Sequence, residues 1–286
     1  MFSYFFIKAL IASVFAGAAC GVIGVWVYLL NVPFVGVAMA HAAFAGAVFG
    51  LFLGINPVAA ALFFCVISSL MIGPVAEKGN FSPNLSIGIL FSFMLGFAFL
   101  FMGKLGSKTS EALSLMWGNI LTISINETIF LALISILILI FMLVFNKGII
   151  AVIYNRSIAF ACGIPEKFIF YSLLILCAVT VSLNIKTIGG LLIYSLITIP
   201  PVSAAQITKK LKNLYLLSSF FAIFSCVAGL FASYIFDLPA GASIVIVSSL
   251  LFALSFIYKY KKRVKSGDKV FSQSETQYLH SAVKKR

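Results

Sequence analysis

The sequence predicts an all-α polytopic membrane protein, built as a bundle of eight or nine transmembrane helices. Of its 286 residues, 62% are hydrophobic and 9% are charged, whereas soluble domains average about 45–50% and about 25%. A water-soluble fold of this length cannot bury that much apolar surface. In addition, many apolar stretches reach the roughly 20 residues that an α-helix needs to cross about 30 Å of hydrocarbon.

Charged and turn-forming residues divide the chain into nine candidate spans. In chain order these are residues 5–29, 35–53, 57–76, 85–102, 129–145, 168–183, 188–207, 214–236 and 240–258. The first lacks a small-residue cleavage site, so we expect a permanent helix rather than a signal peptide. If the first or the third stretch is a re-entrant hairpin, the number of spans falls to eight.

The positive charge is concentrated on one side of the expected membrane. Residues 259–286 hold nine basic and two acidic residues, and cytoplasmic loops are enriched in Lys and Arg. Nine spans with a cytoplasmic C-terminus place 16 of the 20 basic residues inside. These are Lys78, Lys147, Arg156, Lys167, Lys209, Lys210, Lys212 and the nine that follow Tyr258.

We therefore divide the chain into a transmembrane permease domain, residues 1–258, and a basic cytoplasmic tail, residues 259–286. A basic balance is often typical of nucleic-acid binding, but here most of it is a short tail on a very apolar body. We expect the tail to lie on anionic lipid headgroups. No nucleic-acid partner is expected.

The expected spans contain little chemistry of their own. Apart from Lys8, every charged residue falls at or near an expected loop, which excludes the buried carboxylate relay typical of proton-driven carriers and the aspartate pair of an intramembrane protease. GSKT at residues 106–109 lacks the spacing of the phosphate-binding loop GxxxxGK[ST]. The five cysteines show no disulfide or metal spacing. We expect no enzyme activity and no permanently bound cofactor, so any energy comes from another chain.

His41 is the candidate metal-contacting residue. It lies in a stretch otherwise rich in Ala, Gly, Val and Phe, where a neutral imidazole suits a divalent transition metal. The small residues around it would let another helix approach closely. One imidazole is not a complete site, and the alternative is a hydrogen bond to a neighbouring helix.

Residues 155–165, NRSIAFACGIP, predict a short helix in an expected cytoplasmic loop. Asn155 or Ser157 can cap its start, and Gly163 can adopt the left-handed conformation that ends it. The helix presents Ile158 and Phe160, which need an apolar surface to cover them. That surface is either the bilayer or a groove on a soluble partner.

Four longer stretches occur in a characteristic order. They are GVIGVWVYLLNVPFVGVAMAHAAFAGAVFG at residues 21–50, GNILTIS at 118–124, IGGLLIYSLITIPPVSAAQIT at 188–208 and DLPAGASIVIVSSLLFALS at 237–255. Together they resemble the permease subunits of the metal-ion ABC importers of the ABC-3 type, which take up zinc, manganese or iron. The resemblance covers nearly all of residues 14–258 and implies the fold of a type II ABC importer permease.

The resemblance also implies function and partners. It implies the permease subunit of an ATP-binding-cassette importer for a divalent transition metal ion, zinc, manganese or iron, in a bacterial-type inner membrane. Its partners would be a second permease chain in a homodimer, cytoplasmic ABC ATPase subunits and an extracytoplasmic metal-binding protein. The transported ion would be bound only transiently, by His41 from each chain across the two-fold axis. The short helix would couple to the ATPase through Ile158, Phe160, Ala161 and Gly163.

The sequence departs from the family pattern beside His41. Members usually carry an Asp four residues earlier and a Ser directly before this His, where the present chain has Val37 and Ala40. Residues four apart share a helix face, so only a neutral nitrogen remains on this face. Two alternatives stay open: a permease for a metal chelate or another small nutrient, and a channel or carrier that works without ATP.

Overall fold

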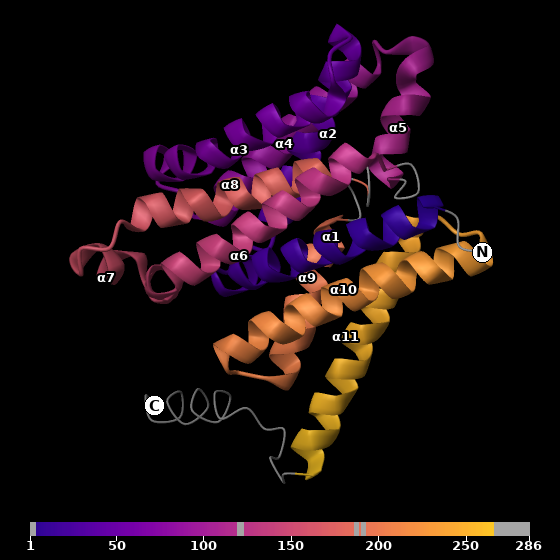
Figure 1. Cartoon of the computed structure of the whole chain (residues 1–286). Helices are drawn as coiled ribbons and strands as arrows, with labels where there is room; N and C mark the ends of the chain where they lie inside the picture. The colour runs from indigo at the N-terminus through magenta and orange to yellow at the C-terminus, as the bar shows by residue number, and fades with distance from the viewer. Residues whose placement is uncertain (1–3, 119–122, 186–188, 190–192, 266–286) are drawn as a thin grey trace, which may run out of the picture.

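The computed structural model describes residues 4–118, 123–185, 189 and 193–265, and all of the secondary structure in this part of the chain is helical, as predicted. Figure 1 shows the helices packed side by side, with α11 crossing the others steeply. The elements are α1 (Tyr4–Leu29), α2 (Val35–Leu53), α3 (Pro57–Gly79), α4 (Pro83–Met102), η1 (Gly106–Lys108), α5 (Thr109–Trp117), α6 (Ile125–Tyr154), α7 (Arg156–Ala161), α8 (Glu166–Asn184), α9 (Ile193–Ile207), α10 (Leu211–Phe236) and α11 (Ala240–Lys265).

Eight of the described helices are long and apolar enough to cross a membrane, namely α1, α2, α3, α4, α6, α8, α10 and α11. The seventh expected span, residues 188–207, differs: α9 has 15 residues and is about 22 Å long. Part of that expected span, residues 188 and 190–192, lies outside the described residues. The first and third stretches form full helices of 26 and 23 residues, so the re-entrant alternative for them is wrong.

Two helices extend beyond their expected ends. α6 begins four residues before the expected 129–145 span and runs for 30 residues, because Ser124 and Glu127 form a capping box at its start and Lys147 does not interrupt it. Its length, about 45 Å, exceeds the hydrocarbon layer and carries α7 away from the bundle. α11 likewise continues past residue 258 to Lys265. Residues 266–286 of the expected tail lie outside the described residues.

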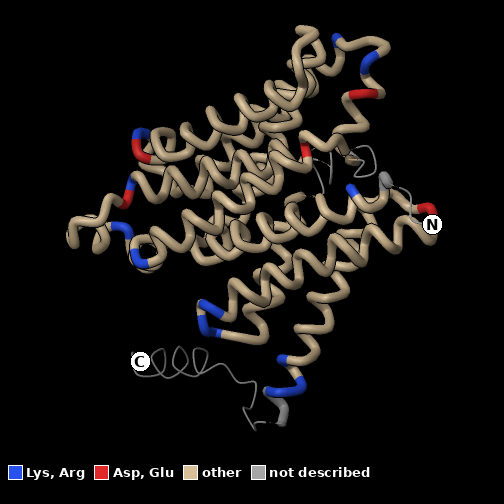
Figure 2. Tube along the Cα trace, in the orientation of Figure 1, with Lys and Arg blue, Asp and Glu red and all other residues tan. Residues whose placement is uncertain are grey.

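Charged side chains gather at the two ends of the bundle (Figure 2). One end carries Lys78, the α6–α8 and α9–α10 connections and the extension of α11, and we call it the basic end. The opposite end carries Lys104, Lys108 and Asp237. This distribution agrees with the alternating order of helices predicted from the sequence.

Hydrogen bonds link segments that the predicted order of spans places on the same side of the membrane. At the basic end, the Asn84 side chain donates to the Asn31 carbonyl at 3.1 Å. The Lys259 ammonium donates to Gln206 Oε1 at 2.7 Å, which ties α11 to the end of α9.

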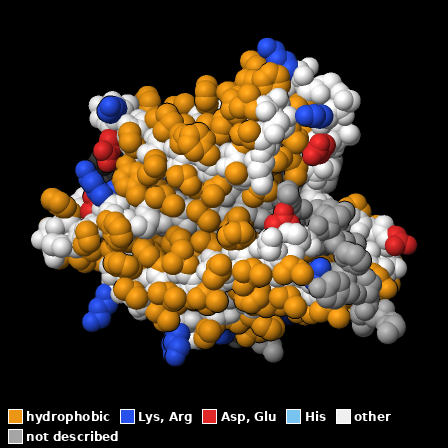
Figure 3. Space-filling view, turned by 45° about the horizontal axis from the view of Figure 1, so that its top comes forward, with side chains coloured by type: hydrophobic (Ala, Val, Ile, Leu, Met, Phe, Trp, Pro, Cys, Tyr) orange, Lys and Arg blue, Asp and Glu red, His pale blue; other side chains and the backbone are white. Residues whose placement is uncertain are grey.

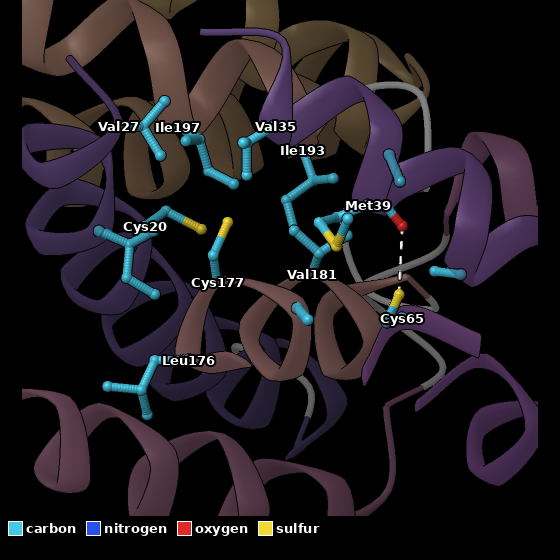
Figure 4. Close-up of a cluster of buried hydrophobic side chains, with 14 of the residues drawn as sticks. Cys20, Val27, Val35, Met39, Cys65, Leu176, Cys177, Val181, Ile193 and Ile197 are labelled. Atoms are coloured by element: carbon cyan, nitrogen blue, oxygen red, sulfur yellow. Dashed lines mark hydrogen bonds between the residues drawn. The ribbon is translucent and has the colours of Figure 1, made fainter. Parts of the chain in front are cut away.

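The core forms where α1, α2, α8 and α9 meet (Figure 4). There the Cys20 and Cys177 side chains point toward one another, and all five cysteines are free. Met39 of α2 is fully buried, and its carbonyl accepts a hydrogen bond from Cys65 Sγ at 3.2 Å. Met39 therefore packs in the core, away from the open face of α2.

Small residues let the helices meet backbone to backbone. A Cβ atom on Gly21 of α1 would lie 2.6 Å from the Cα atom of Ser219 in α10, and Ser218 Oγ donates to the Gly21 carbonyl at 2.7 Å. A Cβ atom on Gly46 of α2 would lie 2.8 Å from the Cα atom of Ala61 in α3. Such crossings suit lipid, where close packing and interhelical hydrogen bonds hold helices together.

The outer surface is apolar between the two charged ends. Figure 3 shows hydrophobic side chains over the middle of one face, with most of the charges toward its margins. On α6, Leu143 is 71% exposed and Val144 is 69% exposed. Among the described residues, Glu166 at the start of α8 is the one buried charged residue. This is the surface that a hydrocarbon layer requires.

Candidate functional site

His41 lies at an opening in the most enclosed part of the bundle. Between Val35 and Leu51, every residue of α2 is buried except Val37, His41 and Phe49, which are partly buried. Val37 and His41 are one helical turn apart and so share a face. The core therefore holds the α2 backbone in place while the imidazole reaches the partly open side next to α4.

Two contacts orient the His41 ring. Its Nδ1 lies 3.0 Å from the Val37 carbonyl oxygen, which can only accept, so Nδ1 carries the proton and Nε2 of the neutral ring keeps a free lone pair. The ring meets Phe91 of α4 edge to face, with centroids 4.7 Å apart at 80°. Metal-binding histidines are commonly fixed by such a bond from the other ring nitrogen.

This geometry bears on the two interpretations of His41. Among the described residues, the hydrogen bond of His41 stays within α2, so the alternative of a bond to a neighbouring helix is not observed. Val37 and Ala40, at the positions of the family's Asp and Ser, add no side-chain donor atom. The described chain contains no group of three or more His, Cys, Asp or Glu able to hold a metal. One nitrogen per chain suits brief contact with a passing ion.

An uncovered stripe of small residues on α4 lies beside this opening. Gly88, Ser92 and Gly96 are spaced four apart, on one helix face. A Cβ atom on Gly88 or Gly96 would meet nothing within 4 Å, while Ser92 is exposed and donates its hydroxyl to the Gly88 carbonyl at 3.0 Å. Phe91, which touches the imidazole, is the neighbour of Ser92. We call Gly88, Ser92 and Gly96 the α4 stripe.

A second functional element, α7, projects from the basic end (Figure 1). The Asn155 side chain accepts hydrogen bonds from the Ser157 and Ile158 amides at 2.9 and 3.2 Å. Gly163 ends the helix with a φ of +75°. The cap and the stop are those that the sequence predicts. We call residues 155–165 the knob.

The knob turns its apolar residues outward. Ile158 is 53% exposed and Phe160 is 71% exposed, and Ala161 and Gly163 are also exposed. Ala159 faces inward and is buried, and Ile164 is partly buried against the core. The structure thus brings the four predicted coupling residues onto one protruding surface, which is far from His41 along the bundle.

An ion pair at the base of the knob was not predicted. Arg156 Nη2 lies 2.8 Å from Glu166 Oε2, and Arg156 Nε donates to the same oxygen at 2.9 Å. The guanidinium carbon also lies 4.1 Å from the ring centroid of Phe170. The sequence feature that could have indicated this ion pair is the Arg at the first position of a capped helix, where its charge opposes the helix dipole.

An apolar groove of about 760 Å³ between α3, α6 and α8 was also not predicted. Asn56, Ser124, Asn126 and Glu127 form its polar rim. Val58, Ala59, Leu62, Phe130, Leu133, Ile134, Leu137, Val179 and Leu183 form its walls. The wall residues Phe130 and Leu133 are each 57% exposed, so the groove opens on the outer surface of the bundle.

The sequence matches to known proteins extend over nearly the whole helical bundle. The model of the ABC 3 transport family matches residues 2–259. The manganese transport system membrane protein MntC of Halalkalibacterium halodurans is 31% identical over 267 residues, which are 92% of this chain and 91% of that protein. The chelated iron transport system membrane protein YfeD of Yersinia pestis is 27% identical over 269 residues, 92% of this chain and 89% of that protein.

A solved structure has the same architecture. PsaBC from Streptococcus pneumoniae in complex with Fab superimposes with a TM-score of 0.79 at 26% identity, over 89% of this chain and 91% of that chain. The family match over residues 2–259 includes all four ordered stretches. This chain is therefore a multi-pass membrane protein that belongs to the ABC 3 transport family.

Proposed function

We propose that this chain is the permease subunit of an ATP-driven importer for a divalent transition metal ion, with manganese preferred over zinc and iron. The observation that carries the proposal is the similarity to MntC over 92% of the chain. ATP hydrolysis takes place on a separate cytoplasmic subunit: GSKT at residues 106–109 forms η1 and the start of α5, not a strand followed by a phosphate loop and a helix.

Uptake of radiolabelled manganese tests this function. Cells that lack this chain should accumulate much less manganese than wild-type cells, and an intact copy should restore uptake that depends on ATP. Parallel assays with zinc, free iron and chelated iron define the cargo. Restoration of chelated iron uptake alone would support the metal-chelate alternative. Unchanged accumulation of every metal, or transport without nucleotide, would contradict the proposal.

We propose that His41 touches the ion on its way through the membrane. Support comes from the free Nε2 of a ring whose Nδ1 is held by the Val37 carbonyl at 3.0 Å. Because no Asp stands at position 37, the ion meets a neutral nitrogen and is released easily.

His41→Ala should lower manganese uptake by about tenfold or more, the loss typical of changes around metal ligands. Binding of the ATPase should remain unchanged, because the knob lies at the basic end. Val37→Ala is the matched control: it alters the same helix face and leaves the backbone carbonyl in place. Uptake by His41→Ala equal to that of the control would show that the imidazole does not contact the ion.

We propose that the basic end faces the cytoplasm and that the knob docks in a groove on the ATPase. Support comes from the exposed Ile158 and Phe160 side chains on a helix whose two ends are both satisfied. The extracytoplasmic metal-binding protein then meets the opposite end, and the tail, residues 259–286, lies on anionic lipid.

Phe160→Asp should release the ATPase from the membrane. Losing a central aromatic anchor costs about 2 kcal/mol or more, which is roughly a thirtyfold weaker complex. Phe160→Leu, which keeps an apolar side chain, is the control and should retain the ATPase. Co-purification measures both variants, and wild-type retention by Phe160→Asp would mean that the ATPase binds elsewhere.

We propose that two permease chains pair across the α4 stripe, so that the two His41 residues approach the two-fold axis. Small residues four apart let membrane helices cross closely, and the space over Gly88 and Gly96 is open. A symmetric pair needs only this one patch on each chain.

Cysteine cross-linking in native membranes tests this interface. Gly88→Cys, Ser92→Cys and Gly96→Cys are made in a Cys162→Ser background, since Cys162 is the one exposed native cysteine among the described residues. At least one of the three should form a covalent dimer with a short bifunctional thiol reagent. Leu143→Cys, on the exposed face of α6, should stay monomeric. Dimers from Leu143→Cys alone would place the interface on α6.

A further inference from the structure

The Arg156–Glu166 ion pair is built more tightly than the local helices need. Asn155 already caps α7, and Glu166 at the first position of α8 would favour the helix dipole without any partner. Yet Glu166 is 8% exposed, and one of its oxygens accepts a hydrogen bond from Nε of Arg156 and lies 2.8 Å from Nη2. A charge removed from water is stabilised only by close pairing. The pair therefore fixes the start of α7 to the start of α8.

The pair joins the knob to α8 across the turn between them. Phe170, one turn into α8, lies under the Arg156 guanidinium, so the side chain is held by one hydrogen bond, an ion-pair contact and a ring face. A Lys could not reproduce this planar arrangement. Within the turn, the Ile164 amide donates to the Ala159 carbonyl at 3.0 Å.

The other side of the knob contains a break in the helical backbone. Asn155 has extended backbone, with φ −166° and ψ +117°, so the α6 helix is interrupted before α7 begins. Bond rotation at a junction of this kind absorbs motion, as at hinges. The knob therefore has a break in the backbone helix on the α6 side and an ion pair with a buried carboxylate on the α8 side.

From its base α8 reaches the helix that carries His41. Near the basic end, the hydroxyl of Tyr171 lies over Gly73 of α3. Farther along, α8 contacts α2, and Figure 4 shows Val181 of α8 beside Met39 of α2. Met39 is two residues from His41, on the buried side of the same helix.

We propose that Arg156 and Glu166 are positioning residues that make the knob and α8 move as one body, and so pass movement of the ATPase to α2 and His41. This inference rests on the proposed docking of the ATPase on the knob. The ion pair is not itself a docking contact: its carboxylate is buried, whereas the docking residues Ile158 and Phe160 are exposed.

The test uses the complete importer, with ATPase and binding protein, in liposomes. The single variants are Arg156→Gln and Glu166→Gln, and Glu166→Gln should leave ATPase affinity within about twofold of wild type, because its carboxylate is buried. Both should lower the manganese imported per ATP hydrolysed by about tenfold, the loss expected when a charged hydrogen bond is broken. The swap Arg156→Glu with Glu166→Arg should restore part of that ratio, and Arg156→Lys should be intermediate. Lys167→Gln, which removes a neighbouring exposed charge, should behave as wild type.

The outcomes separate this inference from the docking proposal. A wild-type import ratio in both single variants would overturn the inference and leave docking intact. Weaker ATPase binding in Arg156→Gln but not in Glu166→Gln would mean that Arg156 touches the ATPase directly, which also overturns it. An unmodified chain that does not bind the ATPase would refute both. If a Gln variant does not fold, the swap and Arg156→Lys decide: equal import ratios in these and wild type would overturn the inference.

Discussion

Hydrocarbon offers no hydrogen bonds, and this constraint shapes the whole chain. Every polar backbone group within the membrane must be satisfied inside a helix, so the described secondary structure is helical. Without water to drive association, helices are held by close contact and by a few shared polar bonds. Gly21 against Ser219, and Gly46 against Ala61, are two of the positions where helices meet backbone to backbone.

The same constraint makes the two candidate functional elements, His41 and the knob, easy to recognise. In a bundle whose buried polar groups are mostly serines bonded to their own helix, His41 presents an unshared nitrogen at a partly open face. At the basic end, α6 extends past the hydrocarbon layer, and the knob exposes Ile158 and Phe160 where water would otherwise penalise them. We propose His41 as the contact for the cargo and the knob as the surface for the ATPase.

Much of this arrangement was predictable because its causes are local. Asn155, Gly163 and the apolar residues between them are close in sequence, so a cap, a stop and an exposed face followed from spacing alone. The span count followed from composition in the same way. His41 was identifiable as a polar exception in an apolar run, but the sequence left its ring orientation open.

The features that could not be predicted depend on contacts between residues of different helices, or on where a helix begins and ends. Arg156 and Glu166 are ten residues apart on two helices, and only the turn between them brings the charges together. α6 was longer than expected because one Lys does not outweigh the helical propensity of the residues around it. Of the seventh expected span, residues 193–207 form α9, and residues 188 and 190–192 lie outside the described residues.

The sequence by itself determined that this chain is a membrane protein and which end of its helical bundle is basic. It also determined where the short helix begins and ends, and that the resemblance to the family includes the region around His41. These are properties of composition and of neighbours along the chain, where propensity and solvation act. Only the tertiary structure decided that Met39 is enclosed while His41 is partly open, that the α4 stripe is uncovered, and that Arg156 is held by α8. Exposure and pairing depend on which helices pack against each other, and in lipid this is set by the fit between surfaces that are far apart in sequence.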